Sequence, residues 1–221
     1  MIAQCVSARK NIRETGNEVT TAREKKRMTK RIALTQPELL FIATDGCVAE
    51  FSSDRVYRYT LRRRWEDRTE RHLSIVWLMF NPSTADEVEN DPTIRKCIGF
   101  SRRWGYEKLV ILNLYAVRNS DPRVLRFVDD PVGPENDEWI RKSLTEASEV
   151  VCAWGCAQHM PTIDARIKDV LKIVAESGRR MVCLGYRKDH HPRHPLMVSY
   201  DTQRIPYKIV NPPGEDHKEE S

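Results

Sequence analysis

The stretch IVWLMFNPS, residues 75–83, decides the fold class. Its six apolar residues follow one another without a polar break, which is typical of strands buried on both faces of a parallel sheet. The run ends at Asn81-Pro82-Ser83, a polar turn that the proline ring stiffens. We therefore expect a buried strand that stops at a group of polar side chains.

Three more short apolar runs follow: LVILN (109–113), VVCAWG (150–155) and MVCLG (181–185). Helix signals separate the four runs. In the first helix Asp91 is a cap before Pro92, and a partial apolar stripe consists of Ile94, Ile98 and Trp104. Pro134 marks the start of the second helix, which has Trp139, Ile140 and Leu144 on one face. The third helix ends at Gly178, and its apolar stripe consists of Ile163, Ile167, Val170, Leu171 and Val174. Strands alternating with helices predict an α/β fold of three layers, in which helices cover both faces of a central four-stranded, mainly parallel sheet.

The segment CVAEFSSDRVYRYTLRRRW, residues 47–65, precedes this body. Its β-prone residues flank the turn formers Ser52-Ser53-Asp54, which predicts an N-terminal β-hairpin. A chain of 221 residues suffices for one sizeable core. We assign residues 36–210 to a single α/β domain, residues 1–35 to a basic arm and residues 211–221 to an acidic tail.

Positive charge is concentrated near the N-terminus. Residues 1–36 hold nine Lys and Arg against three Glu, a charge of 9 − 3 = +6, while the whole chain carries +5, so the rest is near −1. A basic arm on a near-neutral body suits a polyanion such as DNA. A solvated, disordered arm without a ligand explains the composition equally well, and both interpretations stay open.

The composition predicts a cytoplasmic protein. Charged residues make up 31% of the chain and apolar residues 40%, which is ordinary for globular domains. No apolar run approaches the ~20 residues of a membrane span, and the first residues lack the apolar centre of a signal peptide. The six cysteines are scattered, and Cys152 and Cys156 have no second pair or ligand set nearby, so we expect no metal and no cofactor.

All four predicted strands end in polar or special-backbone residues, and in a parallel sheet ligands bind beyond these ends. The ends are Asn81-Pro82-Ser83, Asn113-Leu114-Tyr115, Trp154-Gly155 and Gly185. The amide of Asn81 can orient a water molecule or a base edge, or it can simply hydrogen-bond the backbone of its own turn. The buried amide of Asn113 needs partners that a nucleobase can supply. Tyr115 can stack on a base or simply pack in the core.

Four carboxylates follow the first of these turns: Asp86, Glu87, Glu89 and Asp91. One of them can serve as a general base or stabilise a developing cation. Asp91 is more simply a helix cap, and the two glutamates are more simply solvated. Asp86 has the weakest structural explanation, so Asp86 and Asp91 are the catalytic candidates.

The segment RKDHHPRHPL, residues 187–196, holds three histidines, His190, His191 and His194. Three histidines suggest zinc, but cysteine or carboxylate partners at ligand spacing are missing. A single histidine that stabilises the anion of a leaving group requires less. The basic residues of this loop, Arg187, Lys188 and Arg193, suit a phosphate backbone, although a solvated basic loop has the same composition.

The order and spacing of these motifs over residues 75–198 resemble the uracil-DNA glycosylase superfamily, as a bacterial and phage branch of it. LMFNPS resembles the motif in which a polar residue before proline positions the attacking water, and an Asn there is similar to the mismatch-specific branch. KLVILNLYAVR resembles the strand that ends in a base-reading Asn. VVCAWG resembles the strand that ends in Trp-Gly, and HPRHPL resembles the loop of pattern HP-S-P-L.

This resemblance implies a parallel sheet with helices on both sides and a role for each matching residue. Asn81 would hold the water, Asn113 would read the base, and His191 or His194 would stabilise the departing base, because the loop is one residue longer than the pattern. Arg193 replaces the serine of the loop, and the iron–sulfur cysteines of some branches are not evident. The turn after Asn81 lacks the tyrosine that walls uracil pockets against 5-substituents, which would permit a larger, modified base.

We therefore expect a monofunctional DNA N-glycosylase that flips a damaged or modified base out of double-stranded DNA and hydrolyses its N-glycosidic bond, leaving an abasic site. The basic arm, Arg102 and Arg103 would hold phosphates, and no obligate protein partner is expected. A hypermodified pyrimidine of phage DNA as substrate would make the protein an antiviral defence enzyme. The alternatives are a non-catalytic nucleic-acid or nucleotide-binding protein on the same fold and, from the weak motif NPPG at residues 211–214, a methyltransferase. The enzyme hypothesis requires Asn81, Asn113 and a histidine of the 190s to share one cavity.

Overall fold

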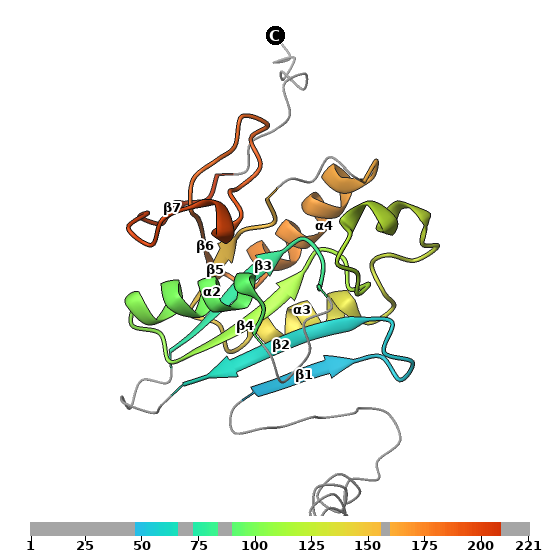
Figure 1. Cartoon of the computed structure of the whole chain (residues 1–221), viewed down its shortest axis with the longest axis horizontal. Helices are drawn as coiled ribbons and strands as arrows, with labels where there is room; N and C mark the ends of the chain where they lie inside the picture. Colours follow the sequence, from blue (N-terminus) through green and yellow to red (C-terminus); the bar gives the residue numbers. More distant parts are fainter. Residues whose placement is uncertain (1–46, 66–72, 84–89, 156–159, 209–221) are drawn as a thin grey trace, which may run out of the picture. The chain divides into compact units, whose positions relative to one another are not determined.

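The computed structural model describes residues 47–65, 73–83, 90–155 and 160–208 (Figure 1). The strands of this part form one seven-stranded sheet in the order β1-β2-β4-β3-β5-β6-β7. They are β1 (Cys47–Phe51), β2 (Arg58–Arg64), β3 (Ser74–Met79), β4 (Lys108–Asn113), β5 (Glu149–Cys152), β6 (Arg180–Cys183) and β7 (Ile205–Pro206). A mixed α/β fold is thereby confirmed. The predictions for the basic arm, for the acidic tail and for Asp86 fall outside the described residues.

The four apolar runs are β3, β4, β5 and β6, and they pair in parallel. β3 lies between β4 and β5, so that Trp77 of β3 is level with Ile111 on one side and Val151 on the other. All six residues of β3 are buried, as the unbroken apolar run predicts.

The expected sheet of four strands is too small. The predicted hairpin, β1 and β2, exists, but it pairs antiparallel with β4 and so extends the sheet at one edge. At the other edge, β7 pairs antiparallel with β6. The residues of a strand indicate that the strand exists, but they do not indicate which other strand it pairs with.

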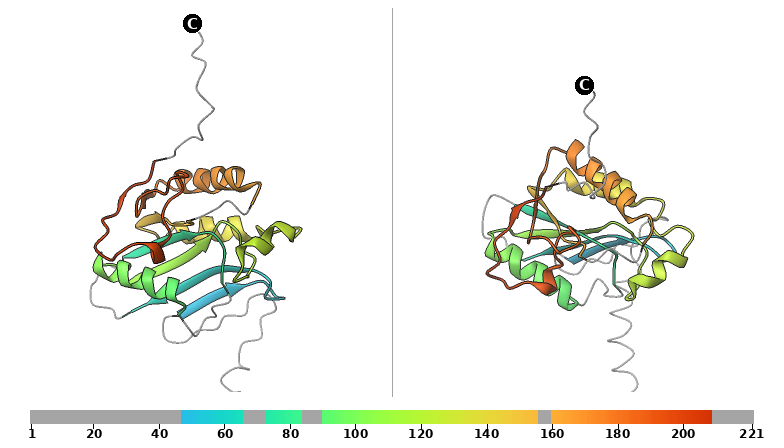
Figure 2. Two further views of the ribbon diagram at one scale, coloured as in Figure 1. Left: turned by 45° about the horizontal axis from the view of Figure 1, so that its top comes forward. Right: turned by 90° about the horizontal axis from the view of Figure 1, so that it is seen from above.

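Helices lie on both faces of the sheet (Figure 2). On one face, α2 (Pro92–Arg103) packs over Ile75 and Trp77 of β3. On the other face, α3 (Asn136–Leu144) and α4 (Ile163–Glu176) pack over Val76 and Leu78. None of the helices in the described ranges is long and apolar enough to cross a membrane.

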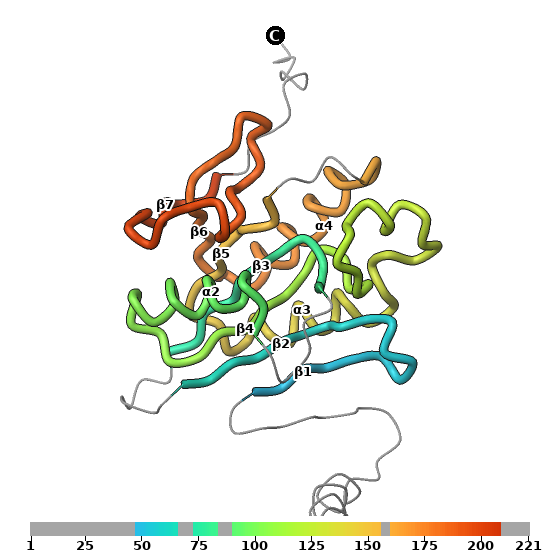
Figure 3. Tube along the Cα trace, in the orientation of Figure 1, coloured from blue at the N-terminus to red at the C-terminus, as the bar shows by residue number. Residues whose placement is uncertain are grey.

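The connections of β3 and its two neighbours diverge at the carboxyl end of β3 (Figure 3). From β3 the chain continues to α2 on one face, whereas from β4 and β5 it continues to α3 and α4 on the opposite face. Adjacent strands whose connections leave to opposite faces open a crevice between their ends, and ligands of open α/β sheets bind there. The topology thus places a binding crevice around the turn Asn81-Pro82-Ser83.

Candidate active site

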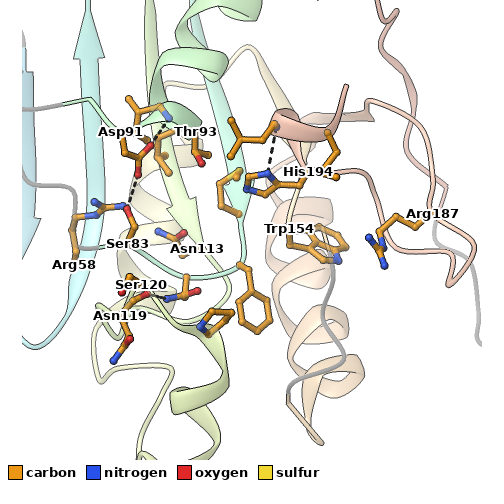
Figure 4. Close-up of a pocket in the computed structure, with 18 residues that line it drawn as sticks. Arg58, Ser83, Asp91, Thr93, Asn113, Asn119, Ser120, Trp154, Arg187 and His194 are labelled. Atoms are coloured by element: carbon orange, nitrogen blue, oxygen red, sulfur yellow. Dashed lines mark hydrogen bonds between the residues drawn. The ribbon is translucent and has the colours of Figure 1, made fainter. Parts of the chain in front are cut away.

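A cavity of about 390 Å³ lies at this position, and such a volume is within the range of small-molecule sites, about 300–1,000 Å³. Its walls come from the ends of β3 and β4, the starts of β2 and α2, the segment after β4, and the segments after β5 and β6. In Figure 4, Arg58, Ser83 and Asp91 lie at one end of the view, Trp154 and Arg187 at the other, and Asn113 and His194 between them.

The amide of Asn81 has a fixed orientation in the cavity wall. Its Nδ2 donates to the carbonyl oxygen of Asn119 at 2.8 Å and to that of Pro82 at 3.0 Å. Carbonyl oxygens only accept hydrogen bonds, so these contacts assign the nitrogen and use both of its hydrogens. The oxygen Oδ1 is left to accept a hydrogen bond, for example from a water molecule.

The amide of Asn113 is a buried donor at the end of β4. The residue is 1% exposed, it lines the cavity, and its Nδ2 has no hydrogen-bond partner in the described part of the chain. A buried donor without a partner costs about 1–3 kcal/mol. A ligand with an acceptor atom in the cavity would remove this cost, so Asn113 is the strongest indication of a bound molecule.

Two buried side chains hold the backbone that carries Asn113. Nδ2 of Asn136, in α3, donates to the carbonyl oxygens of Asn113 and Leu114 at 3.1 and 3.2 Å. Nε of Arg166, in α4, donates to Leu114 at 2.7 Å, and its Nη2 binds Asp137 at 2.6 Å. Helices on the far face thus fix the end of β4, where the sequence alone gave no reason to look.

Replacing Asn136 with alanine is expected to lower the free energy of unfolding by about 1–3 kcal/mol, because the buried carbonyl of Asn113 loses its side-chain donor. Urea unfolding at neutral pH measures the change. Ser143→Ala is the matched control on the same helix, since the buried Oγ of Ser143 has no partner among the described residues. Equal losses in the two variants would show that Asn136 does not stabilise the end of β4.

Asp91 caps α2, as predicted. Its Oδ1 accepts from the backbone N–H of Ile94 at 2.7 Å, and its Oδ2 accepts from Oγ of Ser83 at 2.6 Å. Pro92 follows in the first turn, where its missing N–H costs nothing. Because both carboxylate oxygens have donors, Asp91 contributes a fixed negative charge and links the turn after β3 to α2.

His194 lines the cavity from the segment after β6. Its Nδ1 accepts from the backbone N–H of Leu196 at 3.3 Å, so the neutral ring carries its proton on Nε2. Burial lowers the pKa of this imidazole, and the charge of Asp91 opposes the shift without cancelling it. At neutral pH the cavity therefore contains a neutral imidazole that can donate a hydrogen bond from Nε2.

The lowered pKa of His194 predicts that stability falls with acid. In the unfolded chain its pKa returns to about 6.5, so below this pH the unfolded state binds more protons than the folded state and the free energy of unfolding decreases. His194→Gln is expected to show a smaller decrease when urea unfolding is compared between about pH 7.5 and 5.5. If the free energy of unfolding falls as much with acid in His194→Gln as in the wild type, His194 is not a partly buried, neutral imidazole at neutral pH.

Several predicted residues lie outside the lining of the cavity. Nδ1 of His191 accepts from Nε1 of Trp154 at 3.3 Å, and the ring is not in the cavity wall. Tyr115 is buried in the core, where it packs edge-on against Phe80 with ring centroids 5.3 Å apart. Pro82 contributes its carbonyl oxygen to Asn81 and Asn119, not its ring to the cavity. Of the two histidine candidates, the structure brings only His194 to Asn81 and Asn113.

The predicted phosphate contacts divide into two groups. Arg187 lines the cavity and is paired with Asp189 at 3.1 Å, while Lys188 and Arg193 are exposed in the same loop. Arg102 and Arg103 lie in the last turn of α2, about 15 Å along the helix axis from its N-terminus at the cavity. Arg102 and Arg103 therefore lie outside the lining of the cavity, and their contact with phosphates stays a prediction.

Sequence reasoning missed several residues of the wall, chiefly Arg58, Asn119, Ser120 and Trp154. Trp154 ends a predicted strand, and the sequence gives its side chain no role. Asn119 and Ser120 follow β4 closely and are polar, so the rule that polar residues gather after parallel strands could have found them. Arg58 gives no such signal, because it is one of five arginines in the predicted hairpin and nothing in the sequence distinguishes it from the others.

Comparison with known proteins yields one match. A family model described as a protein of unknown function, DUF1643, matches residues 58–196, more than half of the chain. The chain belongs to this family. No curated protein and no solved structure matches it. Of the residues that line the cavity, all but Met197 fall inside the region that defines the DUF1643 family.

The polar chemistry of this DUF1643 cavity consists of amides, hydroxyls, one imidazole, one carboxylate and two guanidinium groups. Within the described ranges, no three His, Cys, Asp or Glu residues gather in a way that could hold a metal ion. Such a set can orient a water molecule, donate to an anion and bind the polar edge of a heterocycle.

Proposed function

We propose that this protein is a monofunctional DNA N-glycosylase related to the uracil-DNA glycosylase superfamily. One observation carries the proposal: Asn81, Asn113 and His194, from three separate strand ends, line one cavity. Four parallel strands with helices on both faces also support it, because the superfamily resemblance implies this core.

The proposed reaction uses each of these three groups for one task. Nδ2 of Asn113 donates to an acceptor on the extruded base. Oδ1 of Asn81 accepts a hydrogen bond from a water molecule and directs its oxygen toward C1′ of the sugar. The N-glycosidic bond breaks, its electron pair leaves on the base nitrogen, and Nε2–H of His194 donates a hydrogen bond to this anion. The water oxygen bonds to C1′ and gives one proton to solvent, and the departed base anion takes up one proton from solvent, so that a free base and an abasic site remain.

The carboxylate of Asp91 supports the same step electrostatically. The sugar develops positive, oxocarbenium-like charge as the base departs, and a negative charge fixed near the cavity stabilises it. Ser83 and the N–H of Ile94 hold Asp91 in place. Asp86 stays a candidate for this role from the sequence alone.

Exposed apolar side chains at the cavity support a base-flipping mode of binding. Leu196 and Met197 belong to the short helix η2 (Pro195–Met197), line the cavity, and are 45% and 75% exposed. Proteins that distort duplex DNA insert apolar wedges of this kind between base steps. Arg187, Lys188 and Arg193 in the adjoining loop would contact phosphates beside the wedge.

The target is a damaged or modified base, and a hypermodified pyrimidine of phage DNA is the specific candidate. The sequence motif lacks the tyrosine that excludes 5-substituents in uracil pockets. With such a target the enzyme would act in antiviral defence.

Mass spectrometry of free bases released from diverse genomic DNAs, phage DNA included, tests the proposal. The wild-type protein is expected to release a base and to leave sites that alkali or an abasic-site endonuclease cleaves. Asn81→Ala is expected to release at least ~10²-fold less base, while gel-shift affinity for the same DNA stays within a few-fold. Binding without release by either protein would instead favour a non-catalytic nucleic-acid-binding protein on this fold.

A further inference from the structure

A β-bulge in the hairpin changes which side chains face the cavity. Along the β1–β2 pair, Glu50 is opposite Thr60, but the next residue, Phe51, is opposite Arg58. Tyr59 is therefore an extra residue on β2, and the two-residue alternation shifts at this point.

The bulge turns Arg58 toward the active-site face. Leu61 is level with Ile111 of β4, and both pack on the α2 face, so regular alternation would put residue 59 on that face and residue 58 on the other. Instead Tyr59 stacks on Trp139 of α3, with ring centroids 6.4 Å apart, and Arg58 lines the cavity. Bulges next to active sites commonly re-aim a side chain in this way.

Arg58 is a buried positive charge in the cavity wall. The residue is 2% exposed, and a guanidinium keeps its charge at every accessible pH. Two further guanidinium groups, of Arg55 and Arg118, lie 4.3 and 4.8 Å from the ring centroid of Phe51, the residue opposite Arg58. Among the described residues of the cavity wall, Asp91 is the one carboxylate, and its two oxygens accept hydrogen bonds from Ser83 and from the backbone N–H of Ile94.

We propose that Arg58 is a specificity-determining residue, and that the molecule bound in the cavity carries an oxyanion group beside the edge that Asn113 reads. A guanidinium binds carboxylate or phosphate oxygens with directed, charge-assisted hydrogen bonds, and its five N–H donors can serve more than one partner at once. The inference rests on the proposed function for the identity of the ligand as a nucleotide. The oxyanion belongs either to an acidic 5-substituent of the base or to the phosphate of the extruded nucleotide.

Calorimetric titration of the full-length protein separates these two sources. The probes are 5-carboxy-2′-deoxycytidine, 5-hydroxymethyl-2′-deoxycytidine, and 5-hydroxymethyl-2′-deoxycytidine 5′-monophosphate. One of the two anionic probes is expected to bind about 10–100-fold more tightly than the neutral nucleoside, the usual worth of a hydrogen bond to a charged group. Preference for the carboxylate assigns the oxyanion to the base, and preference for the monophosphate assigns it to the backbone.

Two variants test the role of Arg58 itself. Arg58→Gln is expected to remove the preference for the anionic probe, and Arg58→Lys, which keeps the charge, is expected to keep part of it. Arg62→Gln is the matched control, since Arg62 lies on the same strand and forms ion pairs with Glu50 and Glu146. The control should retain the full preference. If Arg58→Gln does not fold, Arg58→Lys still tests the proposal, because a changed preference with unchanged affinity for the neutral nucleoside requires contact with the anion.

Equal binding of all three probes by the wild-type protein would overturn the inference, as would an unchanged preference in both Arg58 variants. These outcomes are independent of catalysis. Anion preference without release of any base would refute the proposed glycosylase and leave the oxyanion site intact. Base release without anion preference would refute the oxyanion site and leave the proposed glycosylase intact.

Discussion

Replacing His194 with alanine is expected to slow base release by about 10²–10³-fold, the usual effect of removing one donor to a developing anion. The partly buried ring is neutral at pH 7, because desolvation lowers its pKa. It therefore stabilises the leaving base by donating a hydrogen bond from Nε2 and not by carrying a positive charge. Single-turnover release of the identified base, measured by mass spectrometry, gives the rate without a contribution from product dissociation.

Two neighbouring histidines serve as controls for this experiment. His190 is exposed and has a positive φ of 61°, so His190→Asn keeps a residue that tolerates this backbone and should release base at the wild-type rate. His191→Ala loses the contact with Trp154 and should lose no more than ~10-fold, since only a positioning contact is removed. A larger loss in His191→Ala than in His194→Ala would give the catalytic role to His191.

Replacing Gly155 with alanine is expected to damage stability and activity together. Gly155 has a φ of +73°, and a Cβ atom there would lie 2.9 Å from Cβ of His194. The left-handed backbone costs an alanine about 1–2 kcal/mol, and the close contact pushes His194 away from its place in the cavity. Because a displacement of about 1 Å at a reacting centre can cost 10²-fold in rate, we expect base release to fall by at least ~10-fold.

Gly178→Ala is the matched control for this variant. Gly178 has a similar φ of +67°, but a Cβ atom there would meet nothing within 4 Å. The free energy of unfolding from urea titration should therefore fall by about 1–2 kcal/mol, with no change in the rate of base release. If the two alanine variants have the same activity, the contact between Gly155 and His194 does not position the catalytic ring.

The sequence is sufficient to predict the helices and strands that have a clear local pattern of residues. The apolar runs of β3 to β6 and the buried stripe of α4, from Ile163 to Val174, are where the patterns indicate. Asp91 and Pro92 start α2 as expected, because capping depends on residues three positions apart. The helix expected at Pro134 begins at Asn136 instead, a difference within the usual uncertainty of helix ends.

The remainder depends on contacts between distant residues. β7 has two residues, Ile205 and Pro206, which carry no period, and proline is confined to edge strands because it cannot donate to a ladder. The sequence does not distinguish His191 from His194. Which of the two lines the cavity depends on how the loop after β6 crosses the end of β5. Arg58 faces the cavity only because of the bulge at Tyr59, and no local sequence pattern predicts a bulge. Chemical types at the site were predictable, whereas directions of side chains were not.

The contact between Gly155 and His194 also bears on how these two positions change during evolution. Gly155 and His194 are 39 residues apart in the chain, yet the side chain of His194 fills the space that a side chain at position 155 would need. A family member with a larger residue at the first position would have no room for an imidazole at the second. We therefore expect glycine and histidine to be inherited or lost as a pair across an alignment of relatives, and frequent separation of the two would show that this histidine is replaceable.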